Sequence, residues 1–208
     1  MSVTFHSLNL IQNSFHSIKL INRNNFRLTF SNIDDLLAKS CQSLDYTKRM
    51  KEKVGVQFLK KYLLPSSGQI IYEKTGRPRL EGDSTNISIS HSKNYVALAE
   101  AAYRIGIDIE EINLRVLNVR NRFLNNREKE LFQEDSGLSN TIAWTIKESL
   151  FKLSHDGGLV FNTDLLILEE ISPQTRYRCS MKDGGVFVEV IVEIVQMENL
   201  IIAFNVQD

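Results

Sequence analysis

The segment from residue 140 to 154 constrains the fold more than any other stretch of this chain, because it is apolar on two sides. Its apolar side chains fall on two nearly opposite helical faces: Ile142, Ile146, Leu150 and Leu153 on one, Trp144 and Phe151 on the other. A helix that is apolar on two sides is usually packed between two layers, so we expect this one near the centre of the fold. Ser139 or Asn140 is the expected residue at its beginning.

Two charged residues lie on one side of this helix. Glu148 and Lys152 are four positions apart, which places them together on the helix surface. An exposed ion pair is the ordinary interpretation of that spacing. Because the surrounding pattern predicts a largely buried helix, the pair is expected to have a partner or a functional role.

A second run, whose Asp108 lies 36 positions before Trp144, reads Gly106-Ile-Asp-Ile-Glu110. Isoleucines alternate with polar residues over 105–111, which predicts a strand with Asp108 and Glu110 on the same side. Neighbouring carboxylates stay ionised together only if they are solvated or share a cation. A solvent-facing edge that continues through Glu111 is the favoured interpretation of this run taken alone.

The two runs together carry Asp108, Glu110 and Glu148 beside Lys147 and Lys152. Three carboxylates near lysines, in a chain with very few thiols, suit a hard, oxygen-binding cation that holds a phosphate ester. From the residues alone, Glu148 is the best candidate for a general base, and Lys152 can stabilise charge on a leaving phosphate.

The rest of the chain reads as an alternation of helices and strands. The lysine-rich surface of the first long helix is interpreted as mostly solvated, and its apolar stripe comprises Val54, Phe58, Leu59, Tyr62 and Leu63. The expected elements are strand-like segments at 3–10 and 18–30, a helix at 45–64 ended by Pro65, a strand pair around 87–99, helices at 115–134 and 140–154, and strands over 164–206 with a hairpin turn at 183–185.

The chain also contains a weak internal repeat. Residues 94–101 and 199–205 resemble each other, and each closes a segment that runs from helix to strands. This predicts an α+β fold of two similar halves, residues 1–104 and 105–208, in a pseudo-twofold arrangement. The cleft between such halves is a preferred place for a ligand.

Composition excludes several classes of protein. The 208 residues carry 25 Lys and Arg against 25 Asp and Glu, and this zero net charge disfavours nucleic acid as a partner. No apolar run is long enough to span a bilayer, and the first residues lack the pattern of a secretory signal. Cys41 and Cys179 are isolated, which argues against structural zinc and for a reducing compartment, most simply the cytoplasm.

Four runs, in order along the chain, resemble the 4′-phosphopantetheinyl transferases of the surfactin-synthetase type. The last two, in combination at this spacing, are specific to that family, and the likeness extends over about residues 45 to 160. Residues 122–124 followed by Glu128 add to it. The four runs are Gly76-Arg-Pro78, Ser90-His-Ser92, Gly106-Ile-Asp-Ile-Glu110 and Trp144-Thr-Ile-Lys-Glu-Ser-Leu-Phe-Lys152.

The resemblance implies an enzyme that transfers the phosphopantetheine arm of coenzyme A to a serine of an apo acyl or peptidyl carrier protein and releases 3′,5′-ADP. It implies Mg²⁺, or alternatively Mn²⁺, held by Asp108, Glu110 and Glu148, with Glu148 and Lys152 as the catalytic residues. The residues implied for coenzyme binding are Arg77, Ser90, His91, Asp108 and Lys152, with a basic residue of the first helix such as Arg49 or Lys51.

The remaining expectations concern partners and alternatives. The carrier, whether of fatty-acid, polyketide or peptide synthesis, is not identified, and the internal duplication favours a monomer. A coenzyme A-binding homologue without turnover and another Mg²⁺-dependent phosphotransferase or nuclease stay as alternatives. Where the family runs into a Gly-x-Gly-Leu turn after Lys152, this chain has residues 154–159, so we expect a reshaped loop. His6, His16 and His155 are interpreted as structural.

Overall fold

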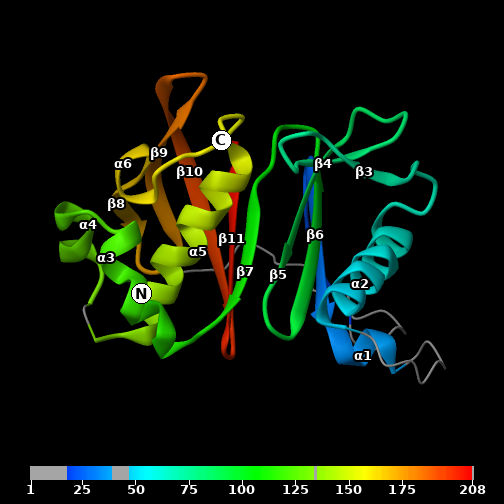
Figure 1. Ribbon diagram of the computed structural model, residues 1–208, viewed down its shortest axis with the longest axis horizontal. Helices are drawn as coiled ribbons and strands as arrows, with labels where there is room; N and C mark the ends of the chain where they lie inside the picture. Colours follow the sequence, from blue (N-terminus) through cyan, green and yellow to red (C-terminus); the bar gives the residue numbers. More distant parts are fainter. Residues whose placement is uncertain (1–17, 39–46, 134, 208) are drawn as a thin grey trace.

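The computed structural model describes residues 18–38, 47–133 and 135–207. The expected strand at 3–10 and the side chains of His6, His16 and Cys41 lie outside these ranges. Figure 1 shows two groups of elements side by side, each built from an antiparallel sheet and its helices. The observed fold is therefore mixed α+β, as the sequence predicts.

The N-terminal group is built on a four-stranded sheet of order β1-β2-β6-β5, and a two-stranded sheet, β3-β4, lies beside it. The strand pair expected around residues 87–99 is confirmed as the β5–β6 hairpin. The elements of this group are β1 (Lys19–Arg23), β2 (Phe26–Asn32), α1 (Ile33–Leu37), α2 (Lys48–Leu63), β3 (Ile70–Tyr72), β4 (Pro78–Leu80), β5 (Asn86–His91) and β6 (Tyr95–Ala101).

Helix α2 covers one face of this sheet. It begins after Thr47, whose hydroxyl accepts a hydrogen bond from the Met50 N–H, and ends at Leu63, shortly before Pro65. Leu59 and Leu63 are buried as expected, and Val56, which the predicted stripe omits, is buried with them. The expected stripe was therefore shifted by part of a turn, because Gly55 lets this side of the helix approach Val96 closely.

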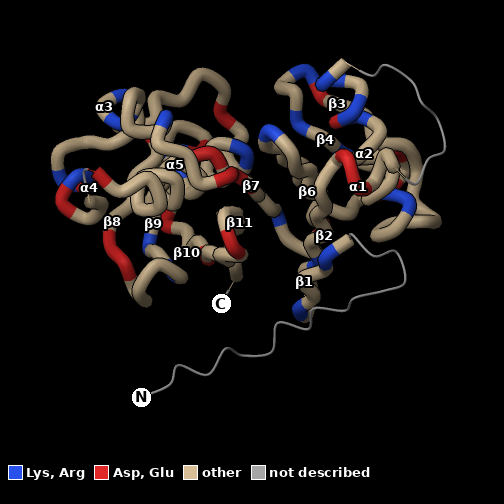
Figure 2. Tube along the Cα trace, turned by 90° about the horizontal axis from the view of Figure 1, so that it is seen from below, with Lys and Arg blue, Asp and Glu red and all other residues tan. Residues whose placement is uncertain are grey.

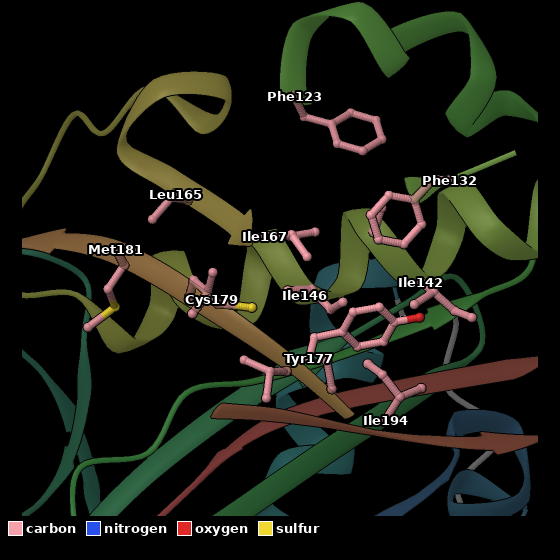
Figure 3. Packing of buried hydrophobic residues seen from close by; sticks show 14 of the residues in the cluster. Phe123, Phe132, Ile142, Ile146, Leu165, Ile167, Tyr177, Cys179, Met181 and Ile194 are labelled. Carbon is pink, nitrogen blue, oxygen red and sulfur yellow. The ribbon is translucent and has the colours of Figure 1, made fainter. Parts of the chain in front are cut away.

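The C-terminal group is built on a five-stranded antiparallel sheet of order β7-β11-β10-β9-β8. The long helix α5 lies against β7 and β11, and its apolar residues fill the core shown in Figure 3. The elements of this group are β7 (Ile107–Glu111), the 3₁₀-helix η1 (Leu114–Val119), α3 (Arg120–Phe123), α4 (Asn126–Leu131), α5 (Gly137–Leu153), α6 (Phe161–Asp164), β8 (Leu165–Ser172), β9 (Arg176–Asp183), β10 (Val186–Met197) and β11 (Leu200–Val206).

The expectation that α5 is packed on two sides is confirmed in part. Ile142, Ile146 and Leu150 are almost fully buried against the sheet. On the opposite side, the Trp144 ring packs on Phe123 and Phe161 from the short helices α3 and α6. Phe151 at the end of that side also stacks on Phe161 but is 38% exposed, so the second layer covers the end of the helix only in part.

Two boundaries in this region differ from the sequence expectation. The expected helix at 115–134 is instead three short segments, because Asn125 forms a capping box with Glu128 and starts a new helix there. Helix α5 begins at Gly137 with Ser136 as its cap. Asn140 does not cap it, because its buried side chain accepts a hydrogen bond from Arg120 and donates to the carbonyls of Gln133 and Ser136.

The expected hairpin turn at residues 183–185 is confirmed. Asp183 pairs with Val186 across the β9–β10 hairpin, so Gly184 and Gly185 form a two-residue loop. Both glycines have positive φ angles, of 62° and 82°, which is the conformation that such tight turns require.

The two sheets meet where β5 lies beside β7, and side chains rather than a backbone ladder join them. Ser88 Oγ accepts a hydrogen bond from the Ile107 N–H at 3.1 Å, and Ser90 Oγ accepts one from the Ile109 N–H at 3.2 Å. We call this junction the serine seam. At its far end the Glu111 carboxylate accepts hydrogen bonds from the Asn94 backbone and side chain. The seam therefore fixes the position of β7 relative to the N-terminal sheet.

No helix in the described part of the chain is long and apolar enough to cross a membrane.

Candidate functional site

A pocket of about 900 Å³ lies between the two groups of elements. Its walls come from α2, from the residues around the β3–β4 turn, from β5, and from the end of α5 with the loop that follows it. A cavity therefore lies where the sequence predicts a ligand site, in the cleft between the two halves. Figure 2 shows acidic stretches beside the α5 and β7 labels and basic stretches around β3 and β4.

Three predicted site residues meet at the serine seam. Lys152 Nζ donates to Asp108 Oδ1 at 2.7 Å and to Ser90 Oγ at 2.8 Å, and Ser90 Oγ donates to the same Asp108 oxygen at 2.7 Å. Asp108 is 3% exposed, so the interpretation of this strand as a solvent-facing edge is wrong. The carboxylate is buried because α5 covers β7 and the N-terminal sheet closes its other side.

The second oxygen of Asp108 is not satisfied in the same way. Oδ2 is buried and has no hydrogen-bond partner among the described residues. A buried carboxylate oxygen without a donor is costly, because it loses its hydration and gains nothing in return. This oxygen therefore marks a position where a cation or a donor from a ligand would be stabilising.

Glu110 and Glu148 form an acidic group with Asp108. Burial raises the pKa of Glu110 to about 7, and the neighbouring charges of Asp108 and Glu148 act in the same direction. Burial likewise raises the pKa of Glu148 to about 7, and Asp108 adds to the shift while Lys152 opposes it. The Trp144 indole N–H donates to Glu110 Oε1 at 3.2 Å and fixes that side chain against α5. The three carboxylates of β7 and α5 are thus close enough to influence one another electrostatically.

This donor set fits a hard divalent cation. Three carboxylates with one orphaned oxygen are the ligand type that Mg²⁺ takes, and a cation would oppose the burial and the repulsion that raise the two glutamate pKa values. In the described ranges, no three acidic, histidine or cysteine side chains are arranged around a common metal position. The Lys152 ammonium forms an ion pair with Asp108 at 2.7 Å.

The neighbouring lysine of the motif has a different role from Lys152. Lys147 is fully buried, and its Nζ donates to Glu128 Oε1 at 2.5 Å and to the Phe161 carbonyl at 2.9 Å. The Glu128 carboxylate also accepts hydrogen bonds from the Ile167 and Asn125 N–H groups. Lys147 therefore ties α5 to α4, α6 and β8, and this supports the helix that carries Glu148 from behind.

Some of the expected coenzyme-binding residues line the pocket and others do not. Arg77, His91 and Arg49 line the pocket together with Lys152. Lys51 does not, because its ammonium binds Asp34 on α1 at 2.9 Å. Coenzyme binding by Lys51 stays a prediction, and Lys53, one turn from Arg49 on α2, lies on the pocket wall.

Several pocket residues were not found by sequence reasoning. Glu52 lines the pocket and lies 3.6 Å from His91 Nδ1, and it also pairs with Lys48. His155, interpreted above as structural, lines the opposite wall. Its position in the reshaped loop after Lys152 was the only signal in the sequence that could have indicated it.

Part of this chain is similar to a known protein family. Residues 104–203, just under half of the chain, match the model of the 4′-phosphopantetheinyl transferase superfamily, named ACPS. The matched segment includes the three carboxylates, Lys147 and Lys152. A comparison with curated proteins finds no significant match.

Proposed function

We propose that this protein transfers the 4′-phosphopantetheine arm of coenzyme A to a serine of an apo acyl or peptidyl carrier protein. The superfamily domain supports transfer of this group to carrier proteins. The observation that carries the proposal is the convergence of Asp108, Ser90 and Lys152, with Glu110 and Glu148 beside them, at one end of a pocket lined by Arg77 and His91. The surfactin-synthetase subtype, the pseudo-twofold relation of the halves and their boundary at residues 104 and 105 belong to the same proposal.

The reaction needs a polyanionic diphosphate to be attacked by a weak nucleophile. A bound Mg²⁺, for which Asp108, Glu110 and Glu148 are the proposed ligands, would mask the negative charge of the diphosphate. The carrier serine oxygen forms a bond to the phosphorus that bears the pantetheine arm, and the bond from that phosphorus to the bridging oxygen breaks. The leaving group is 3′,5′-ADP.

The protein side chains handle the proton and the charge. Glu148 is half-buried beside Asp108 and Lys152, so we assign it the serine proton. Lys152 carries the positive charge nearest to Asp108 and lines the pocket, so it is the residue that stabilises charge on the leaving phosphate oxygen. Arg77, His91 and Arg49 hold the coenzyme by its phosphates and nucleotide end.

The proposal is tested by incubating the protein with coenzyme A, Mg²⁺ and an apo carrier protein, and then measuring the carrier by mass spectrometry. The expected result is a carrier heavier by one phosphopantetheine group, with 3′,5′-ADP formed in equal amount. If coenzyme A binds in calorimetry but neither product forms, the protein is a binding homologue and the proposed activity is wrong. If coenzyme A does not bind at all, both interpretations fail.

A further inference from the structure

A second charged cluster lies at the wall of the pocket formed by the loop after α5, and it is centred on Asp183 at the end of β9. Asp183 Oδ1 accepts a hydrogen bond from the His155 N–H at 2.7 Å and one from Ser154 Oγ at 3.3 Å. Asp183 Oδ2 accepts one from Arg104 Nη1 at 3.0 Å. These bonds hold the 154–156 loop in a fixed position against the β9–β10 turn.

His155 is presented to the pocket by these contacts. Its Nδ1 lies 3.3 Å from Asp183 Oδ2 and also contacts Arg104 Nη1. Because Nδ1 is engaged by protein groups, Nε2 is the ring nitrogen available to a ligand. The His155 side chain is 67% exposed and lines the same pocket as Arg77 and Lys152.

Arg104 has hydrogen-bonding capacity that the described part of the protein does not use. Its Nε and Nη2 are buried and have no hydrogen-bond partner there, so Asp183 satisfies only one of its nitrogens. The loss of hydration leaves this guanidinium with an uncompensated part of its charge. The Arg104 charge also affects Arg77. Burial lowers the pKa of Arg77 most, the charge of Arg104 lowers it further, and the carboxylates of Glu73 and Asp183 oppose this shift.

Asp183 and Glu73 also lie near Arg77 and offset the effect of Arg104 on it, so the unused hydrogen-bond donors, not an excess of charge, distinguish this cluster. Asp156 also lines the pocket, but its Oδ2 accepts a hydrogen bond from the Gly185 N–H at 3.3 Å, which directs it to the β9–β10 turn. Arg77 and His155 therefore line the same pocket, and Arg104 and Asp183 adjoin them outside its lining. Guanidinium and imidazole donors that converge in a partly buried site are suited to a phosphate group.

We propose that His155 and Arg77 contact one phosphate group of the bound ligand, and that Arg104 and Asp183 are the residues that position His155 for this contact. Taking coenzyme A as the ligand rests on the proposed function. His155 is thereby a further binding residue, supplied by the loop at residues 154–158 that follows α5. Arg104 acts through His155 and through its charge, not by contact with the reacting atoms.

The test compares two ligands and four proteins in calorimetry. Coenzyme A carries a phosphomonoester and a diphosphate, and dephospho-coenzyme A carries only the diphosphate. The proteins are the parent, His155→Ala, His155→Lys and Arg178→Ala. Arg178 is 45% exposed and pairs with Glu169 away from the pocket, so its variant controls for loss of one cationic side chain.

The expected result for His155→Ala is binding weaker by about tenfold, since one charge-assisted hydrogen bond is lost. A loss confined to coenzyme A assigns the contact to the phosphomonoester, and an equal loss for both ligands assigns it to the diphosphate. His155→Lys is expected to recover most of the affinity, because it supplies an N–H donor at this position. Arg178→Ala should bind both ligands as the parent does.

Thermal melting separates this effect from a loss of structure. The exposed His155 side chain can be removed without a cavity, so His155→Ala should melt close to the parent. Parent-like affinity of His155→Ala for both ligands would overturn the inference while leaving the proposed function intact. If the parent itself fails to bind coenzyme A, the proposed function fails, and the inference fails with it.

Discussion

Asp108 is the residue on which the geometry of the site depends most. One of its oxygens receives Lys152 and Ser90, and the other is buried without a donor. One oxygen of this carboxylate is therefore fixed by hydrogen bonds, and the other remains available to a cation or a donor. The same side chain can therefore position Lys152 and offer an oxygen to a cation.

Replacing Asp108 by Asn tests this division of roles. The variant keeps the size of the side chain but loses its charge, so affinity for Mg²⁺ in the presence of coenzyme A should fall by about tenfold or more. Because Lys152 is 27% exposed, the loss of its partner should lower stability by only about 1 kcal/mol. Calorimetry and thermal melting measure the two effects, with the exposed Asp83→Asn as the control. Unchanged Mg²⁺ affinity would contradict the assignment.

A second prediction at the scale of residues concerns how much the buried Lys147–Glu128 pair stabilises the fold. Glu128→Gln removes the counter-charge of a fully buried ammonium, whose pKa burial already lowers and Glu128 partly restores. The free energy of unfolding should fall by about 3 kcal/mol, as measured by denaturant titration. The double variant with Lys147→Met should recover part of this loss, because it leaves no buried charge. A double variant less stable than Glu128→Gln would show that the pair is not the cause.

At the scale of elements, the close approach of β7 and α5 depends on Gly106. A Cβ at this position would lie 2.2 Å from the Ser149 carbonyl oxygen and 2.7 Å from the Leu153 nitrogen. The Gly106 N–H also donates to Asn205 Oδ1, which fixes the beginning of β7. The glycine of the Gly-Ile-Asp-Ile-Glu run is thus required by packing against helix backbone, not by an unusual φ angle.

Gly106→Ala should therefore separate β7 from α5 and weaken the contact between Asp108 and Lys152. We expect a loss of about 2 kcal/mol or more of stability, since backbone must move to accept the methyl group. Binding of coenzyme A and Mg²⁺ should weaken with it. Gly157→Ala, at a loop position where a Cβ meets open space, is the matched control for thermal melting. Equal melting temperatures of the two variants would contradict the packing argument.

The link between the loop after α5 and the β9–β10 turn should depend on pH. Burial acts to raise the pKa of Asp183, but hydrogen bonds from His155 and Arg104 outweigh it and lower the pKa to about 2. The ionised folded form is therefore favoured, and its contribution to stability is present above about pH 4 and lost as pH falls toward 2.

Because Asp183 is 20% exposed and screened by solvent, this contribution should be about 1 kcal/mol. The stability difference between the parent and Asp183→Asn, measured by denaturant titration, should be constant above pH 4 and shrink below it. A difference that does not change down to pH 2 would mean that ionised Asp183 does not stabilise the loop.

The sequence predicts these elements where their pattern is periodic and local. The alternation around Asp108, the faces of α5 and the Gly184–Gly185 turn were all visible, because each depends on neighbours a few residues apart. The beginning of α5 could not be predicted in this way, because Asn140 accepts a hydrogen bond from Arg120, which lies 20 positions away in the sequence.

The candidate site shows the same limit. Glu148 and Lys152 were found from helical spacing, and the motif of the family indicated Arg77 and His91. The interaction of Arg104 with Asp183 joins residues 79 positions apart, and no local pattern marks it. The ion pair of Lys51 with Asp34 could not be predicted from the spacing along α2, because Asp34 lies on another helix.

At the scale of the whole molecule, the site exists because two sheets meet edge to edge. The serine seam sets Ser90 of one sheet against Asp108 of the other, and α5 brings Lys152 to both. The pocket opens along this junction, so each wall comes from a different part of the chain. A change in the relative position of the sheets would therefore separate the residues proposed to bind metal from those proposed to bind phosphate.

The central claim is that Glu148 takes part in transfer of the phosphopantetheine group, and one measurement tests it most directly. The rate at which an apo carrier gains this group from coenzyme A is measured by mass spectrometry for the parent, Glu148→Gln and Glu169→Gln. Glu169 is 54% exposed on β8 and pairs with Arg178, so it is the control for loss of a carboxylate elsewhere. The account predicts a fall of at least about a hundredfold for Glu148→Gln, with parent-like melting and a parent-like rate for Glu169→Gln. A Glu148→Gln protein that loads the carrier at the parent rate would contradict it.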